Sequence, residues 1–301
     1  MKSTVKIPLI IAGILIGLGV IILVVGFALG GTSWLFGREA TVEKTAEIND
    51  PFEHIKVETD SCDIRFAPAK DGKCRVEAQL TETMAFSAQV KNNTLTITCR
   101  DKRHWYQLIN FRSFEAKMTV YLPEEEYLSL KLSTASGDVE IPGNLSFQSA
   151  ELSSASGDFQ FLANVTDSLS INTASGDMEC SGMKDAAAIR MNTASGEIQL
   201  KNLTCREIKI NSVSGDVRLQ DVVCREEMSV DTTSGEVDFT DCDAEEITVQ
   251  TVSGDVSGSL RSAKVFSTHT VSGDVRVPQD GNGGKCTVST TSGDINLKIS
   301  G

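Results

Sequence analysis

Histidine is scarce in this 301-residue sequence, which has only His54, His104 and His269. None of them shares a motif with a nucleophile or with a second metal ligand, so the sequence shows no catalytic constellation. The eight cysteines include no CxxC pair and no Cys/His cluster at the spacing of zinc ligands. We therefore expect a protein that is not an enzyme and that holds no cofactor.

Basic residues are also few, with 28 Lys and Arg against 41 Asp and Glu and a net charge of -13. An acidic surface repels phosphate backbones, which excludes nucleic acid as a natural partner. Divalent cations and basic partners are compatible with this charge.

Charge is absent from Ile7 to Gly31, where the sequence is apolar apart from glycine and one proline. A helix of about 24 residues is roughly 36 Å long, enough to cross a ~30 Å hydrocarbon core. Ala28-Leu29-Gly30 would suit a signal-peptidase site, but the apolar run exceeds the usual signal length. We therefore predict that residues 1–37 are a cytoplasmic N-terminus and a transmembrane signal anchor. Lys2 and Lys6 place the N-terminus in the cytoplasm and the rest of the chain outside.

The sequence is dominated by a repeated motif, first seen as Ser136-Gly137-Asp138. It occurs nine times, always as Ser-Gly followed by Asp or Glu, at steps of 19 or 20 residues. The motif glycines are Gly137, Gly157, Gly176, Gly196, Gly215, Gly235, Gly254, Gly273 and Gly293. A period this regular is typical of a stacked repeat architecture.

Apolar and polar residues alternate on both sides of each Ser-Gly pair, as in Leu130 and Leu132 before Gly137 and Val139 and Ile141 after it. Alternation of period two predicts strand, sharp bend, strand. We predict an all-β fold: a single-stranded-rung β-solenoid of the parallel β-helix type with about nine or ten rungs, over residues 129–301. At ~4.8 Å per rung this makes a rod roughly 45 Å long.

Two further columns face outward in this alignment. Asn172, Asn192 and Asn211 stand four residues before their glycines, where their side chains can bond along the stack. Small residues such as Ala174 and Val213 stand two residues before the glycine. This second column is compatible with a contact surface for a partner and with close packing of neighbouring bends.

The region 38–128 is predicted to be a linker and a degenerate β cap, with the cap itself over residues 45–128. Ile55 to Phe66 matches the later repeats position by position, with Cys62 in the place of glycine. Lys91-Asn92-Asn93 predicts a hairpin turn. The basic and aromatic segment Arg100 to Tyr106 suits either a binding loop or a solvated loop between cap strands.

One acidic residue per rung invites comparison with calcium-binding β-rolls, which carry three glycines in a nine-residue repeat. Here each rung has one glycine, and Glu197 and Glu236 replace Asp, which a fixed coordination geometry tolerates badly. We therefore interpret Ser-Gly-Asp as a bend device, with calcium binding by the acidic residues as the alternative. Glycine would supply a positive φ, and Ser and Asp would bond the free backbone groups.

Cys205 and Cys224 both follow their glycines by nine residues and should lie one above the other. A bridge between parallel Cβ atoms at this spacing would be strained. Cys180 and Cys286 fall on apolar columns and are expected to be buried thiols. We predict mostly free cysteines.

The anchor, the cap and the tandem rungs together resemble the bacterial putative adhesin family, a β-strand-repeat domain of unknown function in cell-envelope proteins. The resemblance implies a membrane-anchored, extracytoplasmic binding module whose partners are the lipid bilayer and an unknown protein or cell-surface ligand. An alternative is a self-assembling scaffold resembling bactofilin. Ile295, Leu297 and Ile299 favour that alternative because they end the chain without a cap, which predicts an open edge.

Overall fold

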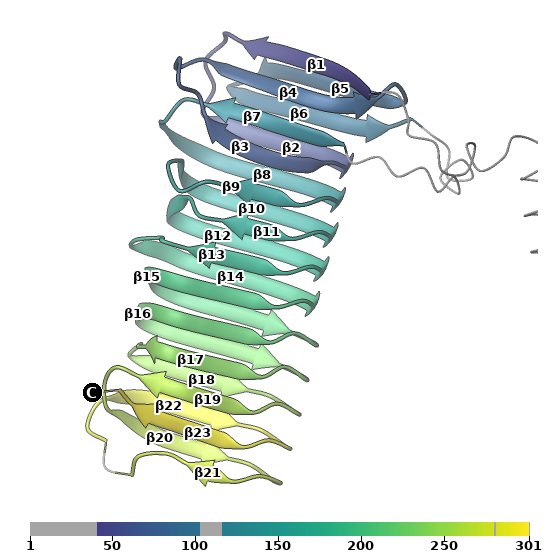
Figure 1. The fold of residues 1–301 in the computed structure, drawn as a ribbon. Coiled ribbons are helices and arrows are strands. Elements are labelled where there is room, and N and C mark those ends of the chain that lie inside the picture. Colours follow the sequence, from purple (N-terminus) through teal and green to yellow (C-terminus); the bar gives the residue numbers. More distant parts are fainter. Residues whose placement is uncertain (1–40, 103–115, 280, 301) are drawn as a thin grey trace, which may run out of the picture.

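The computed structural model describes residues 41–102, 116–279 and 281–300, and every helix or strand assigned in those ranges is a β-strand. The strands stack into one elongated rod (Figure 1). The predicted all-β solenoid is confirmed. The predicted anchor, residues 1–37, lies outside the described ranges, and within those ranges no helix is long and apolar enough to cross a membrane.

Each rung consists of one strand before the Ser-Gly bend and one strand after it, and equivalent strands of successive rungs pair in parallel. The strands before the bend form the first face: β2 (His54–Ser61), β8 (Glu126–Ser136), β10 (Ser146–Ser156), β12 (Asn164–Ser175), β14 (Ala186–Ser195), the second halves of β15 (Ile198–Ser212) and β16 (Val217–Thr232), and β18 (Glu246–Gln250). The strands after the bend form the second face: β3 (Asp63–Pro68), β9 (Val139–Ile141), β11 (Phe159–Phe161), β13 (Met178–Ser181), the first halves of β15 and β16, β17 (Val237–Cys242) and β19 (Val256–Leu260). These strands make eight rungs, and two further rungs follow at the C-terminal end.

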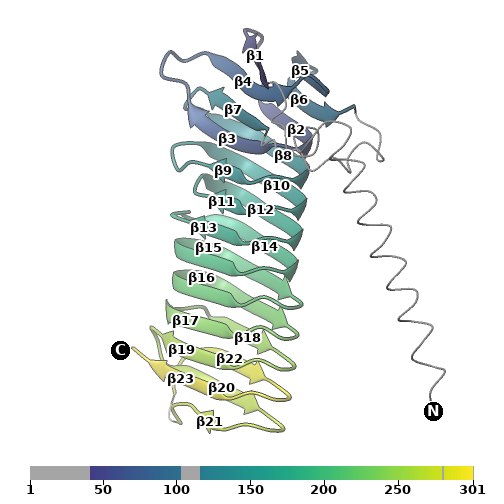
Figure 2. The ribbon, with the colours of Figure 1, turned by 45° about the vertical axis from the view of Figure 1, so that its right-hand side comes forward.

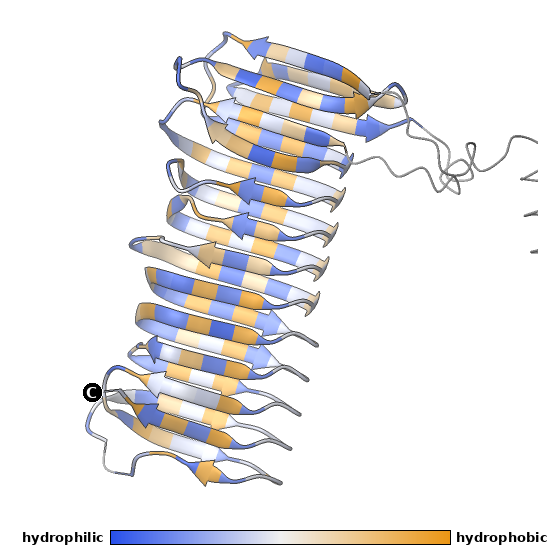
Figure 3. Cartoon of the chain, in the orientation of Figure 1, coloured by the Kyte–Doolittle hydropathy of each residue, from blue (hydrophilic) through white to orange (hydrophobic). Residues whose placement is uncertain are grey.

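The core is a set of apolar columns between the two faces. Leu132, Leu152 and Ile171 are Cα partners in successive rungs and are at most 1% exposed. The colouring of Figure 3 shows the same alternation of apolar and polar residues along the strands. Each such side chain contributes on the order of 1.5–3 kcal/mol by burial, so the columns hold the stack together.

The N-terminal end is closed by antiparallel strands. β6 (Thr94–Asp101) and β7 (Lys117–Leu122) extend the two faces in parallel beyond β2 and β3. β5 (Met84–Lys91) then pairs antiparallel with β6, β4 (Cys74–Thr81) with β7, and β1 (Thr41–Ile48) with β4. The predicted hairpin is confirmed, since β5 and β6 are joined by Asn92 and Asn93 at φ angles of 50° and 62°.

The altered first rung is also confirmed. β2 pairs with β8 and β3 with β9, so the segment around Cys62 stacks directly on the first regular repeat. A Cβ added to Gly137 would lie 2.4 Å from the carbonyl oxygen of Cys62, just as a Cβ added to each later motif glycine would lie close to the carbonyl oxygen of the motif glycine in the adjacent rung. Cys62 therefore heads the glycine column.

The last two rungs are stacked out of chain order. β22 (Gly284–Ser289) and β23 (Ile295–Ile299) lie between β18 and β19 on one side and β20 (Lys264–His269) and β21 (Val275–Arg276) on the other (Figure 2). The chain thus forms the outermost rung first and then returns to fill the position it skipped. The prediction of an open edge was wrong at Ile295, because β21 pairs with Ile295 and Asn296 on the side away from β19. Leu297 and Ile299 pair with β19 alone, and the outermost strands of the rod are β20 and β21.

Candidate functional site

The nine motif glycines form one column along the bend. A Cβ at any of them would lie 1.8–2.4 Å from a backbone carbonyl oxygen of the neighbouring rung, closer than any real contact. The predicted positive φ occurs at Gly137, Gly157, Gly176 and Gly196, with values from 116° to 141°. It was wrong for the other five, where close approach of the next rung is what requires glycine.

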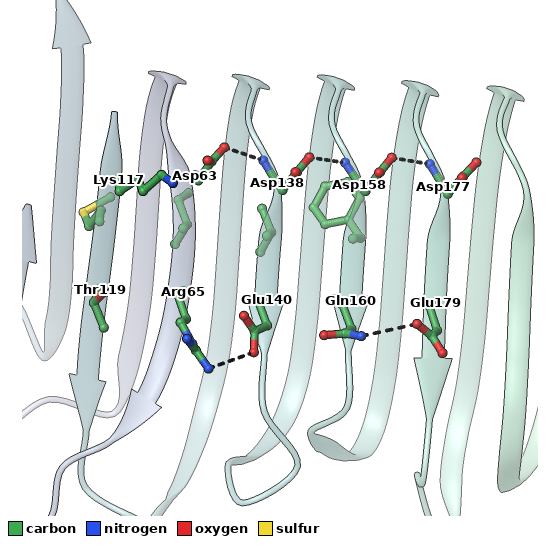
Figure 4. Close-up of a pocket in the computed structure, with 14 residues that line it drawn as sticks. Asp63, Arg65, Lys117, Thr119, Asp138, Glu140, Asp158, Gln160, Asp177 and Glu179 are labelled. Atoms are coloured by element: carbon green, nitrogen blue, oxygen red, sulfur yellow. Dashed lines mark hydrogen bonds and ion pairs between the residues drawn. The ribbon is translucent and has the colours of Figure 1, made fainter. Parts of the chain in front are cut away.

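The acidic residue of the motif builds a ladder between rungs. The Asp158 N–H donates to Oδ1 of Asp138 at 3.0 Å, and the Asp177 N–H donates to Oδ1 of Asp158 at 2.8 Å (Figure 4). Asp63 starts the ladder, because it accepts the Asp138 N–H at 3.1 Å. The C-terminal rungs follow their spatial order, with Asp294 donating to Asp255 and Asp274 donating to Asp294.

The serine of the motif does not bond as predicted. In five of the nine rungs, the hydroxyl three residues before glycine instead bonds a backbone group of its own bend; these hydroxyls belong to Thr134, Ser154, Thr173, Ser212 and Thr232. Thr134 Oγ1 donates to the carbonyl of Ser136 at 2.8 Å, whereas in a later rung the Gly235 N–H donates to Thr232 Oγ1 at 3.1 Å. Ser136 thus contributes its backbone, and the motif aspartate serves the next rung rather than its own.

A groove of about 610 Å³ runs beside the acidic ladder on the second face, where the cap meets the first regular rungs. One rim is the ladder itself, from Asp63 to Asp177 (Figure 4). Lys117 and Thr119, from cap strand β7, line its N-terminal end. Buried side chains such as Phe159 form the floor.

The other rim is a row of exposed or partly exposed polar side chains, one per rung. Arg65 pairs with Glu140 at 3.3 Å, and Gln160 Nε2 donates to Glu179 at 3.3 Å. Glu179 also pairs with Lys201 at 3.3 Å. Six carboxylates against two cations line the groove, so it favours a ligand that presents amines or hydroxyls.

Two shallower grooves, of about 420 and 300 Å³, adjoin on the first face. The predicted asparagine ladder is confirmed there: Asn192 Nδ2 donates to Asn172 Oδ1, and Asn211 Nδ2 to Asn192 Oδ1, both at 2.7 Å. Ala174, Ala194 and Val213 of the small-residue column are exposed along the same grooves, as predicted.

One contact that sequence reasoning missed is the hydrogen bond between His54 Nδ1 and Ser129 Oγ at 2.8 Å. The two residues are Cα partners on β2 and β8, so this bond joins the cap to the first regular rung. Among the described residues no carboxylate hydrogen-bonds to His54, which leaves the pair without the group that orients a catalytic base. His269 is exposed, as predicted, and His104 lies outside the described ranges.

Within the described ranges, no group of three or more His, Cys, Asp or Glu side chains is arranged to hold a metal ion. All eight cysteines are buried and free. Burial raises the pKa of Cys74 and Cys286 to about 12, so these thiols are protonated at neutral pH.

The basic segment after β6 is described only in its first residues. Arg100 forms an ion pair with Glu58 at 3.2 Å, and Lys56 contacts the same carboxylate at 2.7 Å. A hydrogen bond from Lys56, supported by Arg100, lowers the pKa of Glu58. The rest of the proposed binding loop, from residue 103 onward, lies outside the described ranges.

The Toastrack DUF4097 family model matches residues 52–221 and, in an overlapping match, residues 184–301. A comparison with curated protein sequences gave no match.

Three solved bacterial structures share the fold. A putative lipid binding protein from Parabacteroides distasonis ATCC 8503 has a TM-score of 0.56 and 17% identity, over 87% of this chain and 97% of that one. A putative adhesin from the same organism has a TM-score of 0.55 and 15% identity, over 87% and 99%. A putative adhesin from Parabacteroides merdae ATCC 43184 has a TM-score of 0.52 and 14% identity, over 87% and 97%. At these identities the likeness shows the fold alone.

Proposed function

The chain belongs to the Toastrack DUF4097 family, as its resemblance to putative adhesins predicted, and from this we propose that it is a non-catalytic, adhesin-like binding module of the cell envelope. Its relatives by fold are described as putative adhesins and a putative lipid binding protein. The apolar segment from Ile7 to Gly31 supports anchoring in the membrane, with the solenoid on the extracytoplasmic side.

The groove between cap and rungs carries this proposal. It is long, open and lined by polar side chains at one step per rung, which suits an extended surface ligand better than a small metabolite. Since carboxylates predominate, the ligand we propose presents amines or hydroxyls to Glu140 and Glu179.

Co-sedimentation of residues 41–301 with isolated cell envelopes tests the groove. We expect the double variant Glu140→Lys, Glu179→Lys to lose most of the binding. Both side chains are partly exposed and form solvent-exposed ion pairs, so folding should be little affected. Glu151→Lys is the matched control, because Glu151 is an exposed, ion-paired glutamate on the opposite face. Equal binding of all three proteins would overturn the assignment of the groove.

A second candidate is an end-to-end scaffold, favoured by the outermost rung. Val265, Val271 and Val275 on that rung are 53%, 72% and 42% exposed, and β20 and β21 each have one strand neighbour. Open apolar edges of this kind promote association.

Light scattering of residues 41–301 across concentration tests the scaffold. Self-association that is abolished by Val265→Glu but kept by Val213→Glu would support it, because Val213 is equally exposed at 54% but lies mid-rod. A persistent monomer would rule it out.

A further inference from the structure

Cys205 and Cys224 are a pair of thiols in direct contact inside the rod. They are Cα partners on the neighbouring strands β15 and β16, and they are 1% and 3% exposed. Their Sγ atoms are 3.1 Å apart. The contact arises because both cysteines stand nine residues after a motif glycine, so in-register stacking places one on the other.

Two other buried cysteines, Cys242 and Cys286, are arranged differently. Cys242 Sγ donates to the carbonyl of Leu219 at 3.2 Å, so its thiol points to the backbone. Cys286 is equally buried, but its Cα partners are Ile247 and Phe266. Cys205 and Cys224 therefore place two thiols in contact, whereas a single cysteine in an apolar column has no thiol partner with which to form a bond.

We propose that Cys205 and Cys224 form a disulfide that joins two successive rungs when the chain folds in the presence of a small disulfide oxidant. Adjacent strands are ~4.8 Å apart, which is within the range of Cα separations that disulfides span. The sulfur atoms need to approach by about 1 Å to reach the ~2.05 Å of the covalent bond. This refines the prediction from sequence, which judged the bridge by parallel Cβ atoms and not by thiols already turned toward each other.

The reaction balances as thiol–disulfide exchange. One cysteine thiolate attacks oxidised glutathione and releases one reduced glutathione, which gives a mixed disulfide. The second cysteine thiolate then attacks the first cysteine's sulfur in this mixed disulfide, which forms the Cys205–Cys224 bond and releases the second reduced glutathione. Two electrons pass from the cysteines to the glutathione disulfide, and the two thiol protons end on the released glutathione.

The Cys205–Cys224 disulfide should form during folding, before the two rungs bury the thiols. In the folded rod the hydrogen bond between the thiols and their burial raise the pKa of Cys224, which suppresses the reactive thiolate. The same burial keeps reductants from the finished bond.

The test is a digest of the full chain without reduction. The chain is unfolded in urea with reductant, refolded in mild detergent with a glutathione redox couple, alkylated and cut with trypsin. Cleavage beside Lys201, Arg206, Arg218 and Arg225 isolates each cysteine in its own peptide, residues 202–206 and 219–225. We expect these two peptides to be recovered as one disulfide-linked species and the thiol count of the unfolded product to fall from eight to six.

Cys205→Ser should abolish the linked species, and Cys286→Ser should leave it intact. Native chain incubated with the same couple at the onset of melting provides a second measurement that does not depend on refolding yield. Recovery of both peptides singly alkylated in both measurements, or linked to any other cysteine, would overturn the proposal.

Discussion

Gly215 shows what the motif does at the scale of one residue. Its φ is not in the left-handed region, yet a Cβ there would lie 1.8 Å from the Gly196 carbonyl oxygen. The residue is glycine because the next rung occupies the space of a side chain. Gly182 is the opposite case, with a φ of 79° and no atom within 4 Å of an added Cβ.

We predict that Gly215→Ala lowers the free energy of unfolding by about 3 kcal/mol, because the rungs must separate to admit the methyl group. Gly182→Ala should cost only about 1 kcal/mol, the strain of alanine at a positive φ. Urea unfolding of residues 41–301 compares the two. Equal losses would show that backbone conformation, and not contact between rungs, requires the motif glycine.

The acidic ladder is interrupted where glutamate replaces aspartate. Within the described ranges neither Glu197 nor Glu236 accepts a backbone N–H from the next rung, although both donate their own N–H to the rung before. The carboxylate of Glu197 instead pairs with the Arg218 side chain of the next rung. The longer side chain does not reach back to the neighbouring backbone as aspartate does.

Glu236→Asp should therefore repair the ladder by giving the Asp255 N–H an acceptor. We expect a gain of about 0.5–1 kcal/mol in stability and slower amide hydrogen exchange at Asp255. Asp158→Ala should have the reverse effect on the Asp177 amide, which now donates to Asp158. Unchanged exchange in both variants would refute the ladder.

Because of its buried thiols, the folded chain loses stability as the pH rises in the alkaline range. Burial raises the pKa of Cys286 from 9.0 to about 12, so the unfolded chain loses this proton at lower pH than the folded chain does. The stabilisation is complete below pH 9 and is lost as the pH rises from 9 towards 12, by about 1.4 kcal/mol per pH unit.

Cys286→Ala removes this linkage as well as some packing. We expect the stability gap between wild type and variant, measured by urea unfolding, to narrow by about 2 kcal/mol between pH 8 and 10.5. A gap independent of pH would mean that the thiol ionises equally in both states.

At the scale of elements, the unexpected feature is the order of the last two rungs. Gln250 and Ser289 are Cα partners, and His269 pairs with the far side of Ser289. Stacking in chain order would instead put His269 beside Gln250.

Cysteine pairs at these exposed or partly exposed positions distinguish the two stacking orders. Gln250→Cys with Ser289→Cys should cross-link under mild oxidation as readily as a reference pair made at Asn211 and Asp231, which are Cα partners in adjacent rungs. Gln250→Cys with His269→Cys should not, because two rung steps separate them. Cross-linking of the Gln250 and His269 pair, but not of the Gln250 and Ser289 pair, would show that the rungs stack in chain order.

The sequence predicts the strands and bends well because both are local patterns. Period-two alternation around each Ser-Gly pair fixes which residues face the core, and the match of Ile55 to Phe66 with later repeats locates the altered rung. The rung order is not predictable in this way, since every rung carries the same pattern and fits every neighbour. The only sequence feature that points to this rung order is the glycine-rich segment that leads from β21 into β22. There, a Cβ at Gly281 or Gly284 would clash with the backbone of Lys264 or Glu245.

The motif glycine has a positive φ in the early rungs but not in the later ones, and the residue two before it differs between the two groups in the same way. The four rungs whose glycine has a positive φ carry alanine two residues before it, and the later rungs carry valine or threonine. The groove was harder to foresee, because it depends on Lys117 and Thr119 of a cap strand whose place beside the array no repeat alignment gives.

At the scale of the whole molecule, the rod has two unlike ends. The N-terminal end is closed by antiparallel strands and the charged strand β1, whereas the outermost C-terminal rung leaves Val265 and Val275 partly exposed. Between them, the two faces present polar columns at one step per rung. This arrangement suits the function that we propose, an anchored rod that displays repeated contacts outside the cell.

The most direct test of this account is to determine on which side of the membrane the rod lies. Intact cells are treated with a membrane-impermeant amine reagent, and the modified lysines are identified by mass spectrometry. The account predicts modification of Lys131, whose side chain is 57% exposed, and none of Lys264, which is 3% exposed and bonded to Asp243. Modification of Lys131 only after the cells are lysed would contradict it.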